Sequence, residues 1–132
     1  MTTANTQRVF ICGSALRGQP DHGNLQGATF IREAQTAPQY RLHAVENGWH
    51  PGIYEVETDG ISIPGELYEL SPFQYDRLIA TEPPHMYPAE VTLENGETAI
   101  AILYPRELIE QHGWPDISHL GGWVAYKAQQ SV

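Results

Sequence analysis

The chain has 132 residues, of which 41% are hydrophobic, a size and composition typical of one compact globular domain. Seven Lys and Arg residues against 16 Asp and Glu give a formal net charge of −9, and the basic residues form no run, which disfavours nucleic-acid and anionic-membrane partners. The single cysteine, Cys12, excludes an internal disulfide, and no apolar stretch approaches the roughly 20 residues of a membrane helix. We therefore expect one cytoplasmic domain over residues 1–132.

The N-terminal third is dominated by strand patterns. The apolar run at residues 8–12 predicts a buried first strand that Gly13 closes, and a loop with a short helix follows through Leu25. Residues 27–37 predict a second strand. Residues 39–45 alternate between apolar and polar side chains, which predicts a half-buried third strand.

The next strands are expected to form a hairpin. Asp59-Gly60 stands between two strand-like runs, and this dipeptide favours tight two-residue turns. Pro64-Gly65 lies inside the second arm, where proline cannot donate to a ladder, so we expect a bulge or a sheet edge there.

Residues 71–81 carry the clearest helix pattern in the chain. Ser71 is the expected N-cap, Pro72 suits the first helical position, and Gln74 completes a capping box. Prolines at positions 83 and 84 end the helix, which leaves Glu82 at its C-terminal end.

The C-terminal third predicts a second hairpin, over residues 89–104 around Asn95-Gly96, followed by short helices at residues 105–113 and 121–130. Strands dominate, and the connections between them are too short for helical crossovers. The fold class is therefore α+β, with a mainly antiparallel, strongly bent or barrel-like sheet.

The loop after the first strand has the glycine spacing of a phosphate-binding loop but not its chemistry. Gly13 and Gly18 are five residues apart, yet Gln19 and Pro20 stand where lysine and serine or threonine are needed. The backbone N–H groups of such a turn can instead hold a carboxylate, with Arg17 adding charge at the rim. The alternative is that Gly13 only turns the chain and that Arg17 is a solvated surface residue.

Several segments resemble one known superfamily. "VFICGSALRGQP" resembles the first strand and substrate loop of the γ-glutamylcyclotransferase-like, or AIG2-like, superfamily, and "GELYELSPFQYDRL" resembles its Gly-Glu-Leu-Tyr strand and following helix. "TAPQYRLHAV", "PGI" and "DISHLGGWVAYKA" are similar, more specifically, to the C-terminal domain of allophanate hydrolases, a member of this superfamily. The resemblance covers about residues 8–128.

The resemblance implies a small bent β-barrel with flanking short helices, and a cavity between the first loop and the helix before Glu82. It implies Glu82 as the residue that moves a proton. The implied substrate-binding residues are Gly13, Ser14, Ala15, Leu16, Arg17 and Tyr87. Two departures affect the loop, because Cys12 replaces the usual tyrosine and Ala15 is an insertion. In allophanate hydrolase C-terminal domains, an apolar residue is usual at the position of Glu82.

The residues themselves also make Glu82 a candidate acid-base. The C-terminal end of a helix disfavours a carboxylate, and burial would act in the same direction, so both would raise the pKa of Glu82. His85 could hydrogen-bond Glu82 or act as a second acid-base near neutral pH. The alternative is that both are solvated surface residues. The histidines show no zinc-site spacing and Cys12 alone forms no ligand set, so we expect no metal and no cofactor.

Three functions follow from these observations. The leading hypothesis is a stand-alone relative of the allophanate hydrolase C-terminal domain, with a role in nitrogen metabolism. It would act on a small carboxylate-bearing carbamate or amide through Glu82 and His85; in allophanate hydrolase this domain is thought to handle the carboxylated carbamate made by the amidase domain. The second is γ-glutamyl cyclotransfer with release of 5-oxoproline, and the third is a non-catalytic binding module. The expected partner is a small-molecule substrate, and a partner amidase or a homo-oligomer is compatible with the resemblance.

Overall fold

The computed structural model describes residues 6–13, 15–19, 22–25, 27–82 and 84–130. Its strands are β1 (Gln7–Ile11), β2 (Thr29–Gln35), β3 (Tyr40–Val45), β4 (His50–Glu55), β5 (Pro64–Leu70), β6 (Tyr87–Thr92) and β7 (Thr98–Leu103). Its α-helices are α1 (Pro72–Ala80), α2 (Arg106–His112) and α3 (Trp123–Gln130). Short 3₁₀ helices lie at η1 (His22–Leu25), η2 (Glu46–Gly48) and η3 (Ser118–Leu120).

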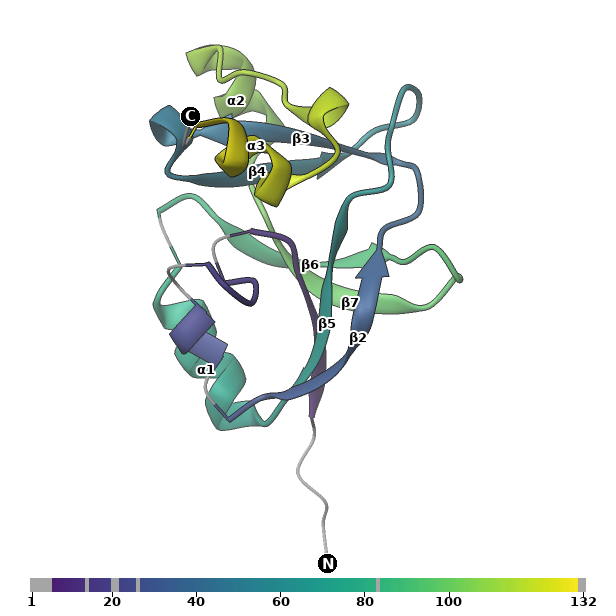
Figure 1. Cartoon of the computed structure of the whole chain (residues 1–132), viewed down its shortest axis with the longest axis vertical. Coiled ribbons are helices and arrows are strands. Elements are labelled where there is room, and N and C mark those ends of the chain that lie inside the picture. Colours follow the sequence, from purple (N-terminus) through teal and green to yellow (C-terminus); the bar gives the residue numbers. More distant parts are fainter. Residues whose placement is uncertain (1–5, 14, 20–21, 26, 83, 131–132) are drawn as a thin grey trace, which may run out of the picture.

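Five strands form one sheet in the order β2-β5-β1-β7-β6, and β3 and β4 form a separate two-stranded ribbon. The ribbon lies across one end of the sheet with α2 and α3 beside it, while α1 and η1 lie at the side of the sheet (Figure 1). Among the described strands, β1 and β7 pair in parallel, and the other pairs are antiparallel. This confirms the α+β class and the mainly antiparallel pairing.

The edge strands β2 and β6 approach each other just beyond one pair of ends. Thr36 and Leu93 form an isolated antiparallel bridge there, supported by a 2.9 Å hydrogen bond from Ala37 N to Thr92 O. In the described part of the chain no ladder joins the two edges, so closure into a barrel stays a prediction.

One predicted hairpin is present and the other is wrong. β6 and β7 pair around Asn95-Gly96, with φ of 90° at Gly96. The chain also turns at Asp59, where φ is 63°, but β4 pairs with β3 while β5 pairs with β1 and β2. The dipeptide therefore specified a turn and not the partner of each arm, because burial of Leu67, Tyr68 and Leu70 draws β5 to the centre of the sheet.

Two further predictions about strands need correction. β3 was expected to be half-buried, yet its residues are almost all buried, because the segment before η3 covers its outer face through a bridge between His43 and Asp116. β5 is an interior strand and not an edge. Pro64 is tolerated there because it is the first residue of the strand, and the irregularity lies instead in β2, between Phe30 and Arg32.

The core lies on both faces of the second half of β1, which explains the apolar sequence of residues 9–11. Val9 and Ile11 pack in a cluster with Leu78 of α1, while Phe10 points into the cluster shared by the sheet and the β3–β4 ribbon. A segment that is buried on both faces needs apolar side chains at every position, and residues 9–12 supply them, whereas Arg8 is exposed.

Helix α1 is built as predicted. The Ser71 hydroxyl accepts a hydrogen bond from Gln74 N at 3.2 Å, and the Gln74 side chain accepts one from Ser71 N at 2.8 Å. The helix ends at Ala80, and Glu82 N donates to the carbonyl of Ile79 at 3.2 Å. Glu82 therefore lies at the negative end of the helix dipole.

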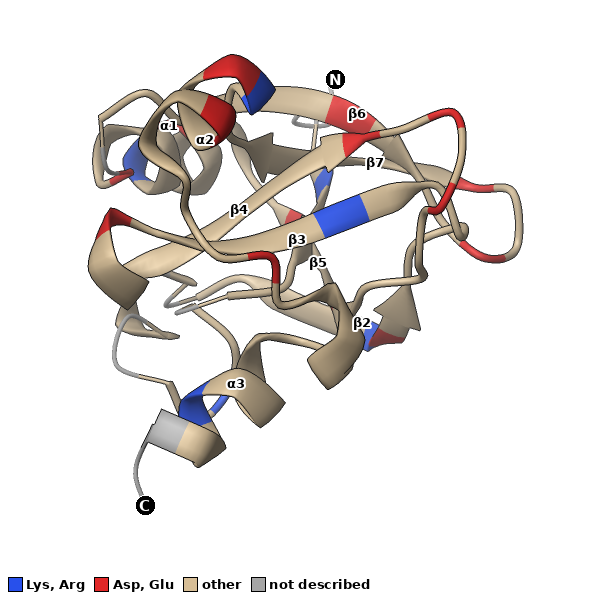
Figure 2. Ribbon diagram, turned by 90° about the horizontal axis from the view of Figure 1, so that it is seen from above, with Lys and Arg blue, Asp and Glu red and all other residues tan. Residues whose placement is uncertain are grey.

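The basic residues lie singly on separate segments, as the view with charges coloured illustrates (Figure 2). These are Arg8 on β1, Arg17 after β1, Arg32 on β2, Arg41 on β3, Arg77 on α1, Arg106 on α2 and Lys127 on α3. Five of them, Arg8, Arg17, Arg32, Arg41 and Arg106, form ion pairs with acidic side chains. No described helix has the length and apolar character needed to cross a bilayer.

Candidate functional site

The first loop, residues 13–19, leaves β1 as a series of tight turns. Leu16 N donates to Gly13 O at 3.0 Å, and Gln19 N donates to Leu16 O at 2.9 Å. An added Cβ at Gly13 would lie 2.5 Å from Pro51 Cγ, so this loop packs directly on the start of β4. Only glycine permits that approach. Ser14, a predicted substrate-binding residue, lies outside the described residues.

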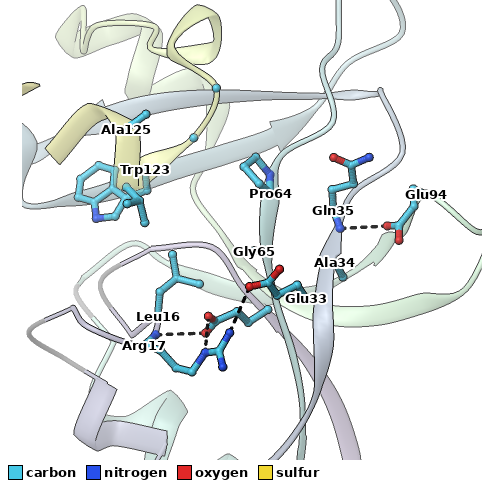
Figure 3. A pocket seen from close by; sticks show the side chains of 14 residues that line it. Leu16, Arg17, Glu33, Ala34, Gln35, Pro64, Gly65, Glu94, Trp123 and Ala125 are labelled. Atoms are coloured by element: carbon cyan, nitrogen blue, oxygen red, sulfur yellow. Dashed lines mark hydrogen bonds and ion pairs between the residues drawn. The ribbon is translucent and has the colours of Figure 1, made fainter. Parts of the chain in front are cut away.

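A buried carboxylate on β5 holds the loop from the other side. Glu66 accepts hydrogen bonds from Arg17 N at 3.1 Å and from Arg17 Nε at 2.8 Å. The guanidinium also pairs with Glu33 at 3.3 Å, as Figure 3 shows, and lies 4.2 Å from the centre of the Phe30 ring. The N–H and side chain of Arg17 are therefore engaged within the protein itself.

Hydrogen bonding keeps Glu66 ionised despite its burial. Burial alone would raise the pKa of Glu66, but the hydrogen bonds from Arg17 and from the Tyr68 hydroxyl (2.9 Å) outweigh it, and the pKa lies below its ordinary value. Burial and the acceptance of this hydrogen bond by Glu66 raise the pKa of Tyr68 to about 12. Glu66 is thus a fixed anion that anchors the loop.

Leu16 and Arg17 line a groove of about 650 Å³ between the first loop, β2, β5 and the start of α3 (Figure 3). Its remaining lining residues are Glu33, Ala34, Gln35, Pro64, Gly65, Glu66, Glu94, Gly121, Gly122, Trp123, Val124 and Ala125. Glu82 is not among them.

Two carboxylates that line the groove, and the tyrosine bonded to one of them, are poorly suited to proton transfer near neutral pH. The pKa of Glu94 is lowered, because its hydrogen bonds from Gln35 N and Arg32 outweigh the effect of burial, and that of Glu66 is lowered as well. Tyr68 stays protonated because its pKa is about 12. None of these three groups exchanges a proton readily near pH 7.

Glu82 acts on the residue that precedes the loop. Burial, and then the negative charge of Glu82, raise the pKa of the Cys12 thiol to about 12. The Glu82 carboxylate therefore lies close enough to the beginning of the loop to act on Cys12 electrostatically. Cys12 is a buried thiol, as expected for a structural residue. The charge of Glu82, the predicted proton carrier, therefore influences the residue just before the loop.

The other predicted site residues differ in exposure. His85 is exposed, with φ of 76°, and its ring centre is 6.3 Å from that of Tyr104. Tyr87 is the first residue of β6 and is 42% exposed. Ala15 is partly buried, and its carbonyl lies 2.9 Å from His22 Nδ1.

Sequence reasoning missed two residues here. Glu66 stands in β5 next to the buried Leu67, and a charged residue within a buried stretch of strand is a signal that could have indicated a buried ion pair. His50 is only 3% exposed and its ring centre lies 5.8 Å from that of Tyr104. A lone histidine beginning a strand carries no comparable signal. Among the described residues, no cluster of three or more His, Cys, Asp and Glu side chains could hold a metal ion.

Comparison with known proteins identifies related chains. The family described as the allophanate hydrolase C-terminal domain matches residues 7–128. A uropathogenic Escherichia coli-specific protein is 28% identical, with a TM-score of 0.86 over 94% of this chain and 97% of its own. No curated protein sequence matches this chain significantly.

Two further structures place the chain in a wider context. Allophanate hydrolase from Kluyveromyces lactis is 28% identical with a TM-score of 0.86, and the match covers 95% of this chain but only 21% of that enzyme. An AIG2-like protein from Mus musculus is 21% identical over 76% of each chain, with a TM-score of 0.59, and shares the fold.

Proposed function

Because the chain belongs to the allophanate hydrolase C-terminal domain family, we propose that it acts on a small carboxylate-bearing carbamate or amide, with Glu82 moving the proton. One observation carries the proposal: the charge of Glu82 reaches Cys12, at the beginning of the first loop. A substrate held by that loop would lie within reach of the Glu82 carboxyl group.

The favoured substrate is a carboxylated carbamate, in which one nitrogen carries two carboxylates. Loss of carbon dioxide breaks one carbon–nitrogen bond, and the electron pair stays on nitrogen. The nitrogen takes a proton from the Glu82 carboxylic acid, which leaves a carbamate, and water then reprotonates Glu82. The step requires the protonated form of Glu82, which is partly buried and follows the C-terminal end of α1.

We expect the beginning of the first loop to bind the substrate carboxylate. Leu16 N and Arg17 N already donate to Gly13 O and Glu66. The other backbone N–H groups that are predicted to bind the carboxylate are those of Gly13, Ala15 and Ser14. Ser14 is outside the described residues. Arg17 supports this carboxylate binding indirectly, because it fixes the loop to β5. His85 is the second proposed proton carrier.

The test is carbon dioxide release from the carboxylated carbamate, generated in place from allophanate by a separate amidase. We expect the wild-type protein to accelerate release of labelled carbon dioxide, and Glu82→Gln to abolish that acceleration. Glu90→Gln is the matched control, because Glu90 is an exposed glutamate on β6. Release no faster than with the amidase alone would refute the proposal.

A second candidate, γ-glutamyl cyclotransfer, is favoured by Glu82 itself. In this reaction the α-amine attacks the γ-carbonyl carbon, Glu82 takes the amine proton, and the departing amine receives it. Release of 5-oxoproline from γ-glutamyl compounds that is lost in Glu82→Gln would favour this candidate over the carbamate reaction. A protein inactive in both assays would instead support a non-catalytic binding module.

A further inference from the structure

His50 presents a buried nitrogen that the protein itself does not satisfy. The residue is 3% exposed, and no described residue offers Nε2 a hydrogen-bond partner. Its other ring nitrogen, Nδ1, lies 3.3 Å from the Pro51 carbonyl. A carbonyl only accepts, so we assign the ring hydrogen to Nδ1, which leaves a lone pair on Nε2 in the neutral ring.

The neutral ring is the form expected near pH 7. Burial lowers the pKa of His50, more strongly than its contact with the Pro51 carbonyl and the charge of Glu46 raise it. Nε2 can therefore accept a hydrogen bond, but no described residue donates one to it. A buried acceptor without a donor is destabilising, and such atoms in folded proteins are normally paired.

His50 lies beside the proposed site. The residue that follows it, Pro51, packs against Gly13 at the start of the first loop. The His50 and His85 rings both approach Tyr104, with ring centres at 5.8 Å and 6.3 Å. His85 follows Glu82 by three residues, so Tyr104 links His50 to the segment that carries Glu82.

We propose that His50 Nε2 accepts a hydrogen bond from an N–H group of the substrate bound between the first loop and Glu82. This inference rests on the proposed function and deepens it. It makes His50 the residue that selects carbamates and amides with a free N–H over analogues with a methylene group at the same position, because a methylene group cannot donate to Nε2.

The first test compares biuret with malonamide, which differ only in their central N–H or methylene group. In ¹⁵N spectra of the histidine rings, His50 should show hydrogen on Nδ1 in the free protein. The signal that His50→Gln removes identifies the residue. We expect biuret to shift the Nε2 resonance and malonamide to leave it unchanged. A Nε2 resonance that does not move with biuret overturns the inference.

Variants separate hydrogen bonding from packing. His50→Phe keeps a ring but removes the acceptor, so we expect biuret affinity to fall about fivefold or more. His50→Gln retains an acceptor oxygen and should recover part of the affinity. The control is His119→Gln, at an exposed histidine. Unchanged biuret affinity in a folded His50→Phe protein would overturn the inference.

The two proposals can fail separately. Glu82-dependent carbon dioxide release together with an unresponsive His50 would leave the proposed function standing and remove the role of His50. Biuret binding through His50 without Glu82-dependent carbon dioxide release would support the role of His50 and contradict the proposed function.

Discussion

The Glu66 carboxylate binds Arg17 twice, at the backbone N–H (3.1 Å) and at the guanidinium Nε (2.8 Å). A residue of β5 thereby fixes both the main chain and the side chain of the first loop. The Arg17 guanidinium was predicted to add positive charge at the rim of a carboxylate site, but it pairs with the Glu66 carboxylate of the protein itself. Arg17 and Glu66 are 49 residues apart in sequence, so this contact also ties the loop to the centre of the sheet.

Glu66→Gln should destabilise the protein by about 1–3 kcal/mol, because it removes the charge that the two Arg17 hydrogen bonds and the Tyr68 hydroxyl stabilise. The measurement is urea unfolding near neutral pH. Glu33→Gln is the matched control, since Glu33 pairs with the same arginine but its side chain is 81% exposed, and its effect should be negligible. Equal losses in both variants would contradict an anchoring role for Glu66.

The same carboxylate predicts an acid-sensitive stability. Because the pKa of Glu66 is lower in the folded protein than its ordinary value of 4.5, the unfolded chain takes up the proton first as the pH falls. The Glu66 contribution should be complete above the ordinary pKa and lost as the pH falls through the folded pKa. Unfolding free energies measured from about pH 6 to about pH 3 should fall less steeply in Glu66→Gln than in the wild type. Parallel curves would contradict this assignment.

Gly13→Ala should destabilise the protein by about 1–3 kcal/mol, because the new methyl group would meet Pro51 Cγ and Cδ at 2.5 and 2.7 Å. Adding Pro51→Ala should recover part of the loss, and denaturant unfolding of both single variants and the double variant measures this coupling. Gly23→Ala is the control, since nothing lies within 4 Å of its added methyl group. Additive losses would show that the loop and β4 are not in contact.

Cys12 reports on the position of Glu82. With a pKa of about 12, the buried thiol should react very slowly with thiol reagents near neutral pH until the protein unfolds. Glu82→Gln removes the second cause of the raised pKa and should increase the labelling rate, while burial keeps the rate below that of the unfolded chain. Labelling kinetics of the native protein measure this, with Glu90→Gln as control. An unchanged rate in Glu82→Gln would remove the observation on which the proposed function rests.

Several local features could be predicted from neighbouring residues alone. The capping box of Ser71 and Gln74, the end of α1 before Glu82 and the turn at Asn95-Gly96 all appeared as expected. Each depends on hydrogen bonds or backbone conformations within a few residues. The family could be recognised for a related reason, because its short motifs occur in order along nearly the whole chain.

The tertiary structure alone decided what these elements meet. The turn at Asp59-Gly60 did not indicate that β5 pairs with β1 and β2. The residues next to Arg17 in the sequence did not indicate its contact with Glu66, and those next to His50 did not indicate its contact with Tyr104. Such contacts join residues far apart in the chain, and they form because the burial of whole apolar faces outweighs local preferences. The sequence by itself determined where the chain turns, caps and ends its elements. Which carboxylate anchors the loop, and which histidine nitrogen is left without a partner, followed only from how those faces pack.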